Sequence, residues 1–243
     1  MATGPRLTIN IRVKRFEAAP AALFENLRLD IAPSSVVALV GPSGIGKSTL
    51  LRLIAGIDTA FDGSIEIDGV RAAAASTPGF VFQDPRLLPW LTASDNIRAA
   101  SPGCSEQEAH TALQRVGLAT SGSLYPHQLS GGMQRRVALA RALAVNARLL
   151  LLDEPFVSLD RTLVGEMHLL FSRLIAEGRP TVVFVSHLTD DAARLADRAI
   201  LLDHRPARIV ADIALPIPPA ARDAAVLGQY RTLLDSFSGV ECE

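Results

Sequence analysis

The sequence has few cysteines, no long apolar run and no excess of charge of either sign. Its two cysteines, Cys104 and Cys242, lie far apart and fit no metal-ligand spacing, so we expect free thiols in a reducing cytoplasm. No apolar run approaches the roughly 18 residues that a membrane-spanning helix needs. The N-terminus lacks an apolar stretch after a basic start, which a secretory signal peptide would have.

The charge balance argues against a nucleic-acid partner. The chain of 243 residues carries 24 Lys and Arg against 25 Asp and Glu, a formal net charge of −1. A strong nucleic-acid binder usually shows a basic excess or a basic stripe, and here only short pairs such as Arg135-Arg136 occur. What the chain does have is apolar residues, 49% of the total. That is enough to build the core of one large α/β domain or two small ones.

Short apolar segments alternate with helical patterns along most of the chain. The segments predicted as strands are residues 36–40, 80–82, 149–152, 181–185 and 199–202. Their nearly continuous apolarity indicates strands buried on both faces, as in a parallel sheet. Helices are predicted over residues 47–55 and 160–177, and Gly56 and Gly178 end them. This alternation favours an α/β fold, an open sheet covered by helices.

Two regions depart from that alternation. Residues near 5–35 and 61–71 have the pattern of short strands, and Asp68-Gly69 is a hairpin signal, so we expect a small antiparallel layer. The following region is mainly helical, with a capping box at Ser105. We predict one domain over residues 1–243. Its parts are the core with the β layer (about 1–84 and 147–215), a helical subdomain (about 85–146) and a C-terminal tail without assignable chemistry (216–243).

A glycine-rich loop follows the first predicted core strand and matches G-x-x-x-x-G-K-[ST] in full. Its residues are Gly41, Pro42, Ser43, Gly44, Ile45, Gly46, Lys47 and Ser48. The backbone N–H groups of such a loop point at an anion, and the helix that follows adds the positive end of its dipole. We expect Lys47 to reach the β- and γ-phosphates and the Ser48 hydroxyl to ligate Mg²⁺. By itself the motif indicates a phosphate-binding NTPase or kinase.

Two acids end the strand predicted over residues 149–152. Asp153 and Glu154 then lie at the carboxyl edge of the sheet, where open α/β sheets bind ligands. We expect Asp153 to hold Mg²⁺, directly or through water. Glu154 points to the other side of the strand by alternation, where it can act as general base toward the water that attacks the γ-phosphate.

A second candidate anion site lies in the helical region. The segment Leu129-Ser130-Gly131-Gly132-Met133-Gln134 opens a helix, with Ser130 as N-cap and two glycines in the first turn. An uncovered, glycine-rich helix N-terminus can bind an anion. Because one phosphate loop already exists far away in the chain, this second site suggests a nucleotide shared between two molecules.

The segment 129–134 resembles the signature motif of ABC ATPases, and the resemblance extends over about residues 7–212. Residues 41–49, which include Thr49, resemble the Walker A loop, and Asp153 with Glu154 resembles Walker B. The resemblance also implies roles for four more residues. These are Phe16 as the aromatic that stacks on adenine, Gln83 as the Q-loop glutamine at Mg²⁺ and the attacking water, Asp160 of the D-loop and His187 as the switch histidine at the γ-phosphate. Phe16 could instead pack in the core.

The resemblance implies a fold, a mechanism and partners. The implied fold is a P-loop NTPase (RecA-like) core with a small antiparallel β layer and a helical subdomain. Two copies would pack head to tail. Each ATP, with Mg²⁺, would lie between the Walker A loop of one copy and Ser130, Gly131, Gly132 and Gln134 of the other. A membrane permease would dock near Gln83 to Trp90 on the cytoplasmic face of the membrane, and an extracytoplasmic solute-binding protein would belong to the same system.

The cargo and some alternatives stay open. Residues 84–92 and 205–209 resemble those of importer ATPases for nitrate, sulfonates and taurine, but relatives there also carry thiamine-precursor pyrimidines. A soluble ABC ATPase without a transport role is one alternative, although such proteins usually carry two cassettes or long insertions. A P-loop GTPase or small-molecule kinase is another, but the Asn-Lys-x-Asp motif of GTPases is absent. The direction of transport rests on resemblance alone.

Overall fold

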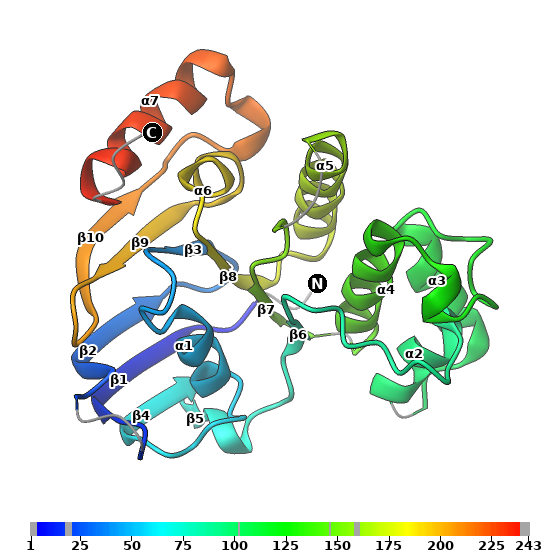
Figure 1. Cartoon of the computed structure of the whole chain (residues 1–243), viewed down its shortest axis with the longest axis horizontal. Coiled ribbons are helices and arrows are strands. Elements are labelled where there is room, and N and C mark those ends of the chain that lie inside the picture. The colour runs from blue at the N-terminus through cyan, green and yellow to red at the C-terminus, as the bar shows by residue number, and fades with distance from the viewer. Residues whose placement is uncertain (1–3, 18–20, 102, 146, 158–160, 239–243) are drawn as a thin grey trace.

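The computed structural model describes residues 4–17, 21–101, 103–145, 147–157 and 161–238. Figure 1 shows a large central sheet with a smaller sheet beside it and a group of helices at the opposite end. The central sheet has the order β10-β9-β3-β8-β7-β6. Its parallel strands are β3 (Val36–Val40), β6 (Gly79–Val81), β7 (Leu149–Asp153), β8 (Thr181–Ser186) and β9 (Arg198–Asp203). The prediction of a parallel, doubly buried sheet is therefore confirmed.

The second sheet is antiparallel, as predicted, and has the order β2-β1-β4-β5. Its strands are β1 (Leu7–Lys14), β2 (Phe24–Ile31), β4 (Asp62–Ile67) and β5 (Val70–Arg71). Asp68 and Gly69 connect the last two, and both have positive φ angles, the backbone that a tight two-residue hairpin requires.

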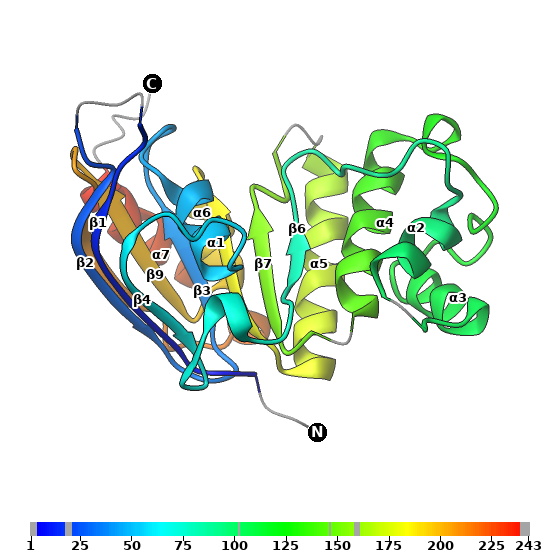
Figure 2. The same cartoon turned by 90° about the horizontal axis from the view of Figure 1, so that it is seen from below.

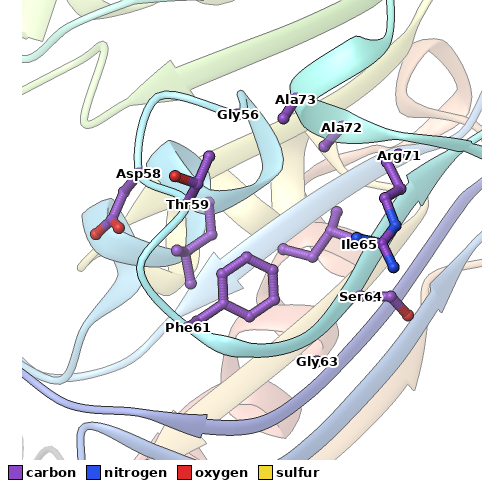
Figure 3. Close-up of a pocket in the computed structure, with 11 residues that line it drawn as sticks. Gly56, Asp58, Thr59, Phe61, Gly63, Ser64, Ile65, Arg71, Ala72 and Ala73 are labelled. Atoms are coloured by element: carbon purple, nitrogen blue, oxygen red, sulfur yellow. The ribbon is translucent and has the colours of Figure 1, made fainter.

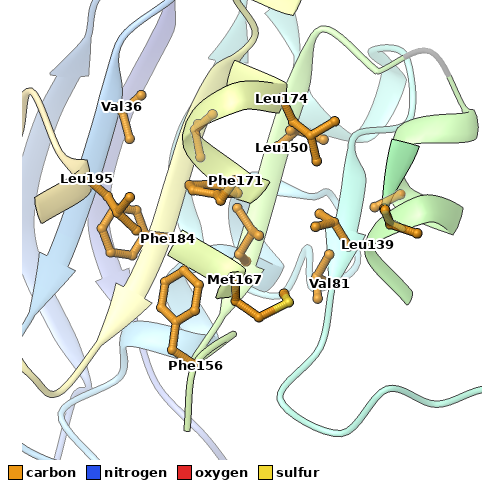
Figure 4. Close-up of a cluster of buried hydrophobic side chains, with 14 of the residues drawn as sticks. Val36, Val81, Leu139, Leu150, Phe156, Met167, Phe171, Leu174, Phe184 and Leu195 are labelled. Carbon is orange, nitrogen blue, oxygen red and sulfur yellow. The ribbon is translucent and has the colours of Figure 1, made fainter. Parts of the chain in front are cut away.

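Helix α1 (Lys47–Ile54) packs between the two sheets. Alternate residues of the central strands divide between two apolar clusters. In β7, Leu149 and Leu151 face the cluster that contains α1, whereas Leu150 and Leu152 face the cluster that contains α4 and α5. Figure 4 shows part of this second cluster, in which Phe156, Phe171 and Phe184 fill the space between α5 and the sheet.

Three helices, α2 (Ala93–Ala100), α3 (Glu106–Arg115) and α4 (Gly131–Ala144), lie together at the end of the molecule beyond β6 (Figures 1 and 2). The predicted capping box is present, because Ser105 Oγ accepts from the backbone N–H of Glu108 and the Glu108 carboxylate accepts from that of Ser105. Short 3₁₀ helices are η1 (Ala72–Ala74), η2 (Pro126–Gln128) and η3 (Pro219–Ala221).

The remaining helices are α5 (Arg161–Gly178), α6 (Thr189–Leu195) and α7 (Ala224–Ser238). Residues 224–238 of the predicted tail thus form a helix that packs on α6, and an antiparallel edge strand, β10 (Arg208–Ala214), precedes the tail. No helix was predicted over residues 224–238, although Leu227, Tyr230 and Leu234 recur at helical spacing and pack against the core. Among the described residues, no helix has both the length and the apolarity that crossing a bilayer requires.

Candidate functional site

The glycine-rich loop runs from the end of β3 to the start of α1. Gly41 and Gly46 have φ angles of 155° and 110°, and an added Cβ would have no room at either position. At Gly41 it would lie 2.3 Å from the Leu202 carbonyl oxygen, and at Gly46 it would lie 2.8 Å from Cζ of Phe24. The tight packing of this loop on its neighbours therefore requires glycine.

Lys47 is folded back into this loop. Its Nζ donates to the carbonyl oxygens of Gly41 at 2.6 Å and Pro42 at 2.9 Å, and the residue is only 4% exposed. Burial lowers the pKa of Lys47, and the nearby carboxylates of Glu154 and Asp153 act in the opposite direction. The ammonium group is thus held beside the loop in a partly desolvated place, where an anionic ligand would stabilise its charge.

Ser48 and Asp153 meet across the site. The Ser48 hydroxyl donates to Oδ1 of Asp153 at 2.7 Å, which joins the start of α1 to the end of β7. A hydroxyl and a carboxylate side by side fit Mg²⁺, which usually takes one or two protein ligands and completes its octahedron with phosphate oxygens and water. In the part of the chain that the structure describes, no group of three or more His, Cys, Asp or Glu could hold a metal without such help.

Glu154 and His187 form a second close pair. Nδ1 of His187 lies 3.7 Å from Oε2 of Glu154. Glu154 has a φ of 48°, so the chain turns sharply at the end of β7, and its backbone N–H donates to the Val185 carbonyl at 3.2 Å. The adjacent ends of β7 and β8 thereby bring together a carboxylate and an imidazole from distant parts of the sequence.

Of these residues, Lys47, Ser48 and Glu154 line an open pocket of about 400 Å³. Its lining consists of Phe16, Leu23, Ser43, Gly44, Gly46, Lys47, Ser48, Thr49, Gln83 and Glu154. Phe16 is 46% exposed, so it is not a core residue, and Nζ of Lys14 lies 4.9 Å from the centroid of its ring. The pocket thus has an aromatic ring at one border and the phosphate loop and the Glu154 carboxylate at the others. Its size is in the range of ligand-binding clefts.

A smaller pocket of about 150 Å³ lies behind the C-terminal end of α1 (Figure 3). Thr59, Phe61 and Arg71 are among the residues that line it, and none of the predicted site residues is. The carboxylate of Asp58, at its border, is paired with Nζ of Lys14 at 2.6 Å. Burial raises the pKa of Asp58, but the hydrogen bonds from Lys14 and Ala60 outweigh it and hold the pKa below its ordinary value. This pocket is separate from the site.

The segment 129–134 lies elsewhere. Ser130 caps α4 by accepting from the backbone N–H of Met133 at 3.3 Å, Gly131 is exposed and Gly132 is buried. Gln134 turns back, with Nε2 donating to the carbonyls of Pro126 and Leu129. None of these residues lines the 400 Å³ pocket, and β6 and β7 stand between α1 and α4 in both views (Figures 1 and 2). One chain by itself does not bring the two predicted anion sites together.

With this geometry in place, comparison with known proteins identifies the family. Residues 24–157, more than half of the chain, match the family described as ABC transporter. The chain belongs to the ABC transporter family. The predicted family and the predicted P-loop core are thus confirmed, and the GTPase and kinase alternatives are excluded. As a member of this family the protein binds and hydrolyses ATP.

Curated relatives cover most of the chain. An "Aliphatic sulfonates import ATP-binding protein SsuB 2" of Xanthomonas axonopodis pv. citri is 43% identical over 89% of this chain and 73% of its own. Its namesake in Burkholderia cenocepacia is 37% identical over 94% of this chain and 87% of its own. A solved structure, "Dimeric Structure of MJ0796, a Bacterial ABC Transporter Cassette", has a TM-score of 0.76 at 30% identity, and covers 86% of this chain and 98% of its own.

Two further residues, Asp160 and Arg205, concern the nucleotide site of this ABC protein. Asp160 of the predicted D-loop lies outside the described residues, as does Cys242. Arg205 has no predicted role at the site, but its Nη2 lies 3.4 Å from the position that a Cβ on Gly44 would occupy. The turn between β9 and β10 thus adds a cation beside the phosphate loop. No sequence pattern indicates this placement, because it depends on the neighbouring positions of β9 and β3 in the sheet.

Proposed function

We propose that this ABC protein is the ATP-hydrolysing subunit of an importer for small sulfonate-like anions. The meeting of the pairs Ser48–Asp153 and Glu154–His187 beside one phosphate loop supports the hydrolytic role, and the similarity to sulfonate import ATP-binding proteins supports the cargo class. In this proposal Lys47 and the backbone N–H groups of residues 43–49 hold the phosphates, while Gly41 and Pro42 shape the start of the loop. Phe16 stacks on the adenine, as its exposed ring at the border of the pocket allows.

The metal chemistry follows from the first pair. Ser48 and Asp153 would hold Mg²⁺, with Gln83 at the edge of the same pocket. Bound there, Mg²⁺ would neutralise charge on the β- and γ-phosphate oxygens. The chain's own part is to present a hydroxyl and a carboxylate at fixed positions from two rigid elements.

The second pair carries the hydrolytic step. In this proposal Glu154 accepts a proton from a water that attacks the γ-phosphate, and His187 donates a hydrogen bond to the phosphate oxygens; their 3.7 Å separation supports a joint role. The positive φ of Glu154 marks the sharp turn by which the chain leaves β7 directly after Asp153. The reaction breaks the bond between the γ-phosphorus and the bridging oxygen and yields ADP and inorganic phosphate.

We further infer a head-to-tail dimer. Ser130, Gly131, Gly132 and Gln134 do not line the pocket of their own chain, so a second copy must supply them if they contact ATP. The similar cassette structure is described as dimeric, which supports this arrangement. Gln134 would take part through its backbone or by shaping the turn, because its side chain is occupied within its own chain.

The segment after Gln83 is suited to contact a membrane permease on the cytoplasmic side. Asn96, only 1% exposed, accepts from the Leu88 N–H and donates to the carbonyls of Leu88, Leu91 and Thr92. These bonds fix the loop that presents Trp90, which is 69% exposed, while Leu87 packs against the core. A rigid loop with an exposed Trp resembles the anchors of protein interfaces. We propose that it docks the permease and that a solute-binding protein completes the system.

The test is a gentle detergent pull-down of the tagged protein from its native membranes, with mass spectrometry of what accompanies it. The proposal expects a polytopic permease and a solute-binding protein whose cargo can then be screened with sulfonates, nitrate, taurine and pyrimidines. Trp90→Ala should lose the permease while ATP hydrolysis by the isolated subunit stays at the parent rate. Recovery of soluble partners alone would favour an ABC ATPase without a transport role.

Phe16→Ala is expected to weaken ATP binding roughly 5- to 150-fold, because base–aromatic stacking contributes roughly 1–3 kcal/mol. Phe16→Tyr should bind as the parent does. Titration with a fluorescent ATP analogue measures both. Phe237→Ala is the matched control, since Phe237 is 45% exposed but lies on α7. Equal affinities for Phe16→Ala and the control would remove Phe16 from the nucleotide site.

A further inference from the structure

A chain of buried polar groups joins α5 and α6 to the end of β8. His168 Nε2 lies 3.0 Å from Oδ1 of Asp191, and the Ser186 hydroxyl donates to Oδ2 of Asp191 at 2.6 Å. Exposure is 8% for His168, 4% for Asp191 and 2% for Ser186. Burying polar groups costs free energy unless they are paired. Even a paired buried group rarely stabilises the fold more than apolar side chains of similar volume would. Their presence in this apolar core therefore calls for another reason.

One end of this chain reaches the switch segment. The Ser186 hydroxyl, which donates to Asp191, also accepts from the backbone N–H of Leu188 at 3.0 Å. A hydroxyl has one proton to donate, so both bonds together fix its orientation. The Ser186 side chain and the Leu188 backbone, on either side of His187, are thus joined by a hydrogen bond. This bond limits how the backbone at His187 can move.

The other end reaches the segment that carries Glu154. The His168 ring meets the Phe156 ring edge to face, with centroids 4.5 Å apart and an interplanar angle of 82°. Phe156 is two residues beyond Glu154 and is buried beside α5 (Figure 4). Offset and edge-to-face ring pairs of this kind have a preferred geometry. His168 thus contacts the segment of Glu154 directly and the segment of His187 through Asp191 and Ser186.

We propose that His168 is a positioning residue that holds Glu154 and His187 in register at their 3.7 Å separation. The proposal rests on the function proposed above for that pair. In this proposal α5 determines the relative position of Glu154 and His187, because His168 on this helix is linked to both segments. A displacement of α5 would then move the base and the switch histidine relative to each other. Asp191 and Ser186 act in the same way, through His187 only.

The first test is His168→Leu. This substitution fills a similar volume with an apolar side chain and removes the polar contact with Asp191. The expected result is a kcat for ATP hydrolysis lowered roughly 10- to 100-fold, the cost of a misplacement of about 1 Å at reacting groups. The KM for ATP should stay within about twofold, because Lys47 and the phosphate loop are untouched. His168→Gln should recover most of the kcat, since its amide can donate to Asp191.

Leu174→Ala is the matched control. Leu174 lies on the same helix and in the same core cluster at 3% exposure, but it is not part of the polar chain. It should lower the thermal midpoint, as core truncations do, and leave kcat at the parent value at a temperature where the protein stays folded. A parent-like kcat for His168→Leu, or an equal fall in kcat for Leu174→Ala, would overturn the positioning role.

A double-mutant cycle separates this inference from the proposed function. If His168 acts through His187, the losses of kcat from His168→Leu and His187→Ala should overlap. The kcat of the double variant should then be much higher than the value obtained by multiplying the two single losses. Losses that multiply would overturn the inference. If His187→Ala alone keeps the parent rate, the role of His187 in the proposed function fails instead, whatever His168→Leu does.

Discussion

Glu154→Gln is expected to bind ATP as tightly as the parent and to hydrolyse it roughly 10²- to 10⁴-fold more slowly, the range that general-base catalysis contributes. The amide has the size of the carboxylate but cannot take a proton from water. Lys47, Ser48 and Asp153, which are assigned to the phosphates and the metal, keep their contacts. Phosphate release and nucleotide binding, measured on the same preparation, test both halves of this expectation.

The same variant tests the dimer. With hydrolysis blocked, the ATP-bound state persists, so Glu154→Gln should elute as a dimer with ATP and Mg²⁺ and as a smaller species without nucleotide. Glu177→Gln is the control, because Glu177 lies on the surface of α5 with Arg115 as partner. It should behave as the parent in every assay. Parent-like turnover in Glu154→Gln would show that another group activates the water.

Lys47→Ala is expected to weaken ATP binding itself, roughly 10- to 100-fold, because a hydrogen bond to a charged group is worth about 1.5–3 kcal/mol. Lys47 is already partly desolvated, and two loop carbonyls hold its ammonium group beside the expected phosphate site. Hydrolysis should fall with occupancy and recover in part at high ATP concentration. Isothermal titration measures the affinity.

Arg52→Ala provides the comparison for Lys47→Ala. Arg52 is exposed and in the last turn of the same helix, α1, so its loss removes a positive charge without touching the loop. It should bind ATP as the parent does. The thermal midpoint of Lys47→Ala should be checked as well, because the loop loses two hydrogen bonds. Unchanged ATP affinity in a folded Lys47→Ala would remove Lys47 from the phosphate site.

The core strands and the phosphate loop could be predicted because their signals are local. Residues 36–40 and 149–152 are apolar runs of strand length, and they form β3 and the apolar part of β7. A glycine-rich loop between a strand and a helix has few other uses. The prediction for residues 80–82 was off by one residue, since β6 ends at Val81 and Phe82 instead meets the Arg86 guanidinium, 4.3 Å from its ring centroid.

Other features could not be predicted, because they depend on which distant segments become neighbours. His168 is a lone histidine in an amphipathic helix, and only the packing of α5 and α6 gives it Asp191 as a partner. The approach of Arg205 to Gly44 depends on the order of the strands. Gln134 fits the motif, but its side chain bonds with the carbonyls of the preceding loop.

The amino-acid sequence already specifies the residues that are able to bind phosphate and activate water. Side-chain types and their spacing within a single segment are fixed by the covalent chain. Which of them meet is settled by packing. Ser48 and Asp153 are joined, Glu154 and His187 stand 3.7 Å apart, and Ser130 is kept away from the pocket of its own chain. The physical reason is the parallel sheet, whose hydrogen-bonded order places the ends of β3, β7, β8 and β9 at one edge regardless of their distance along the chain.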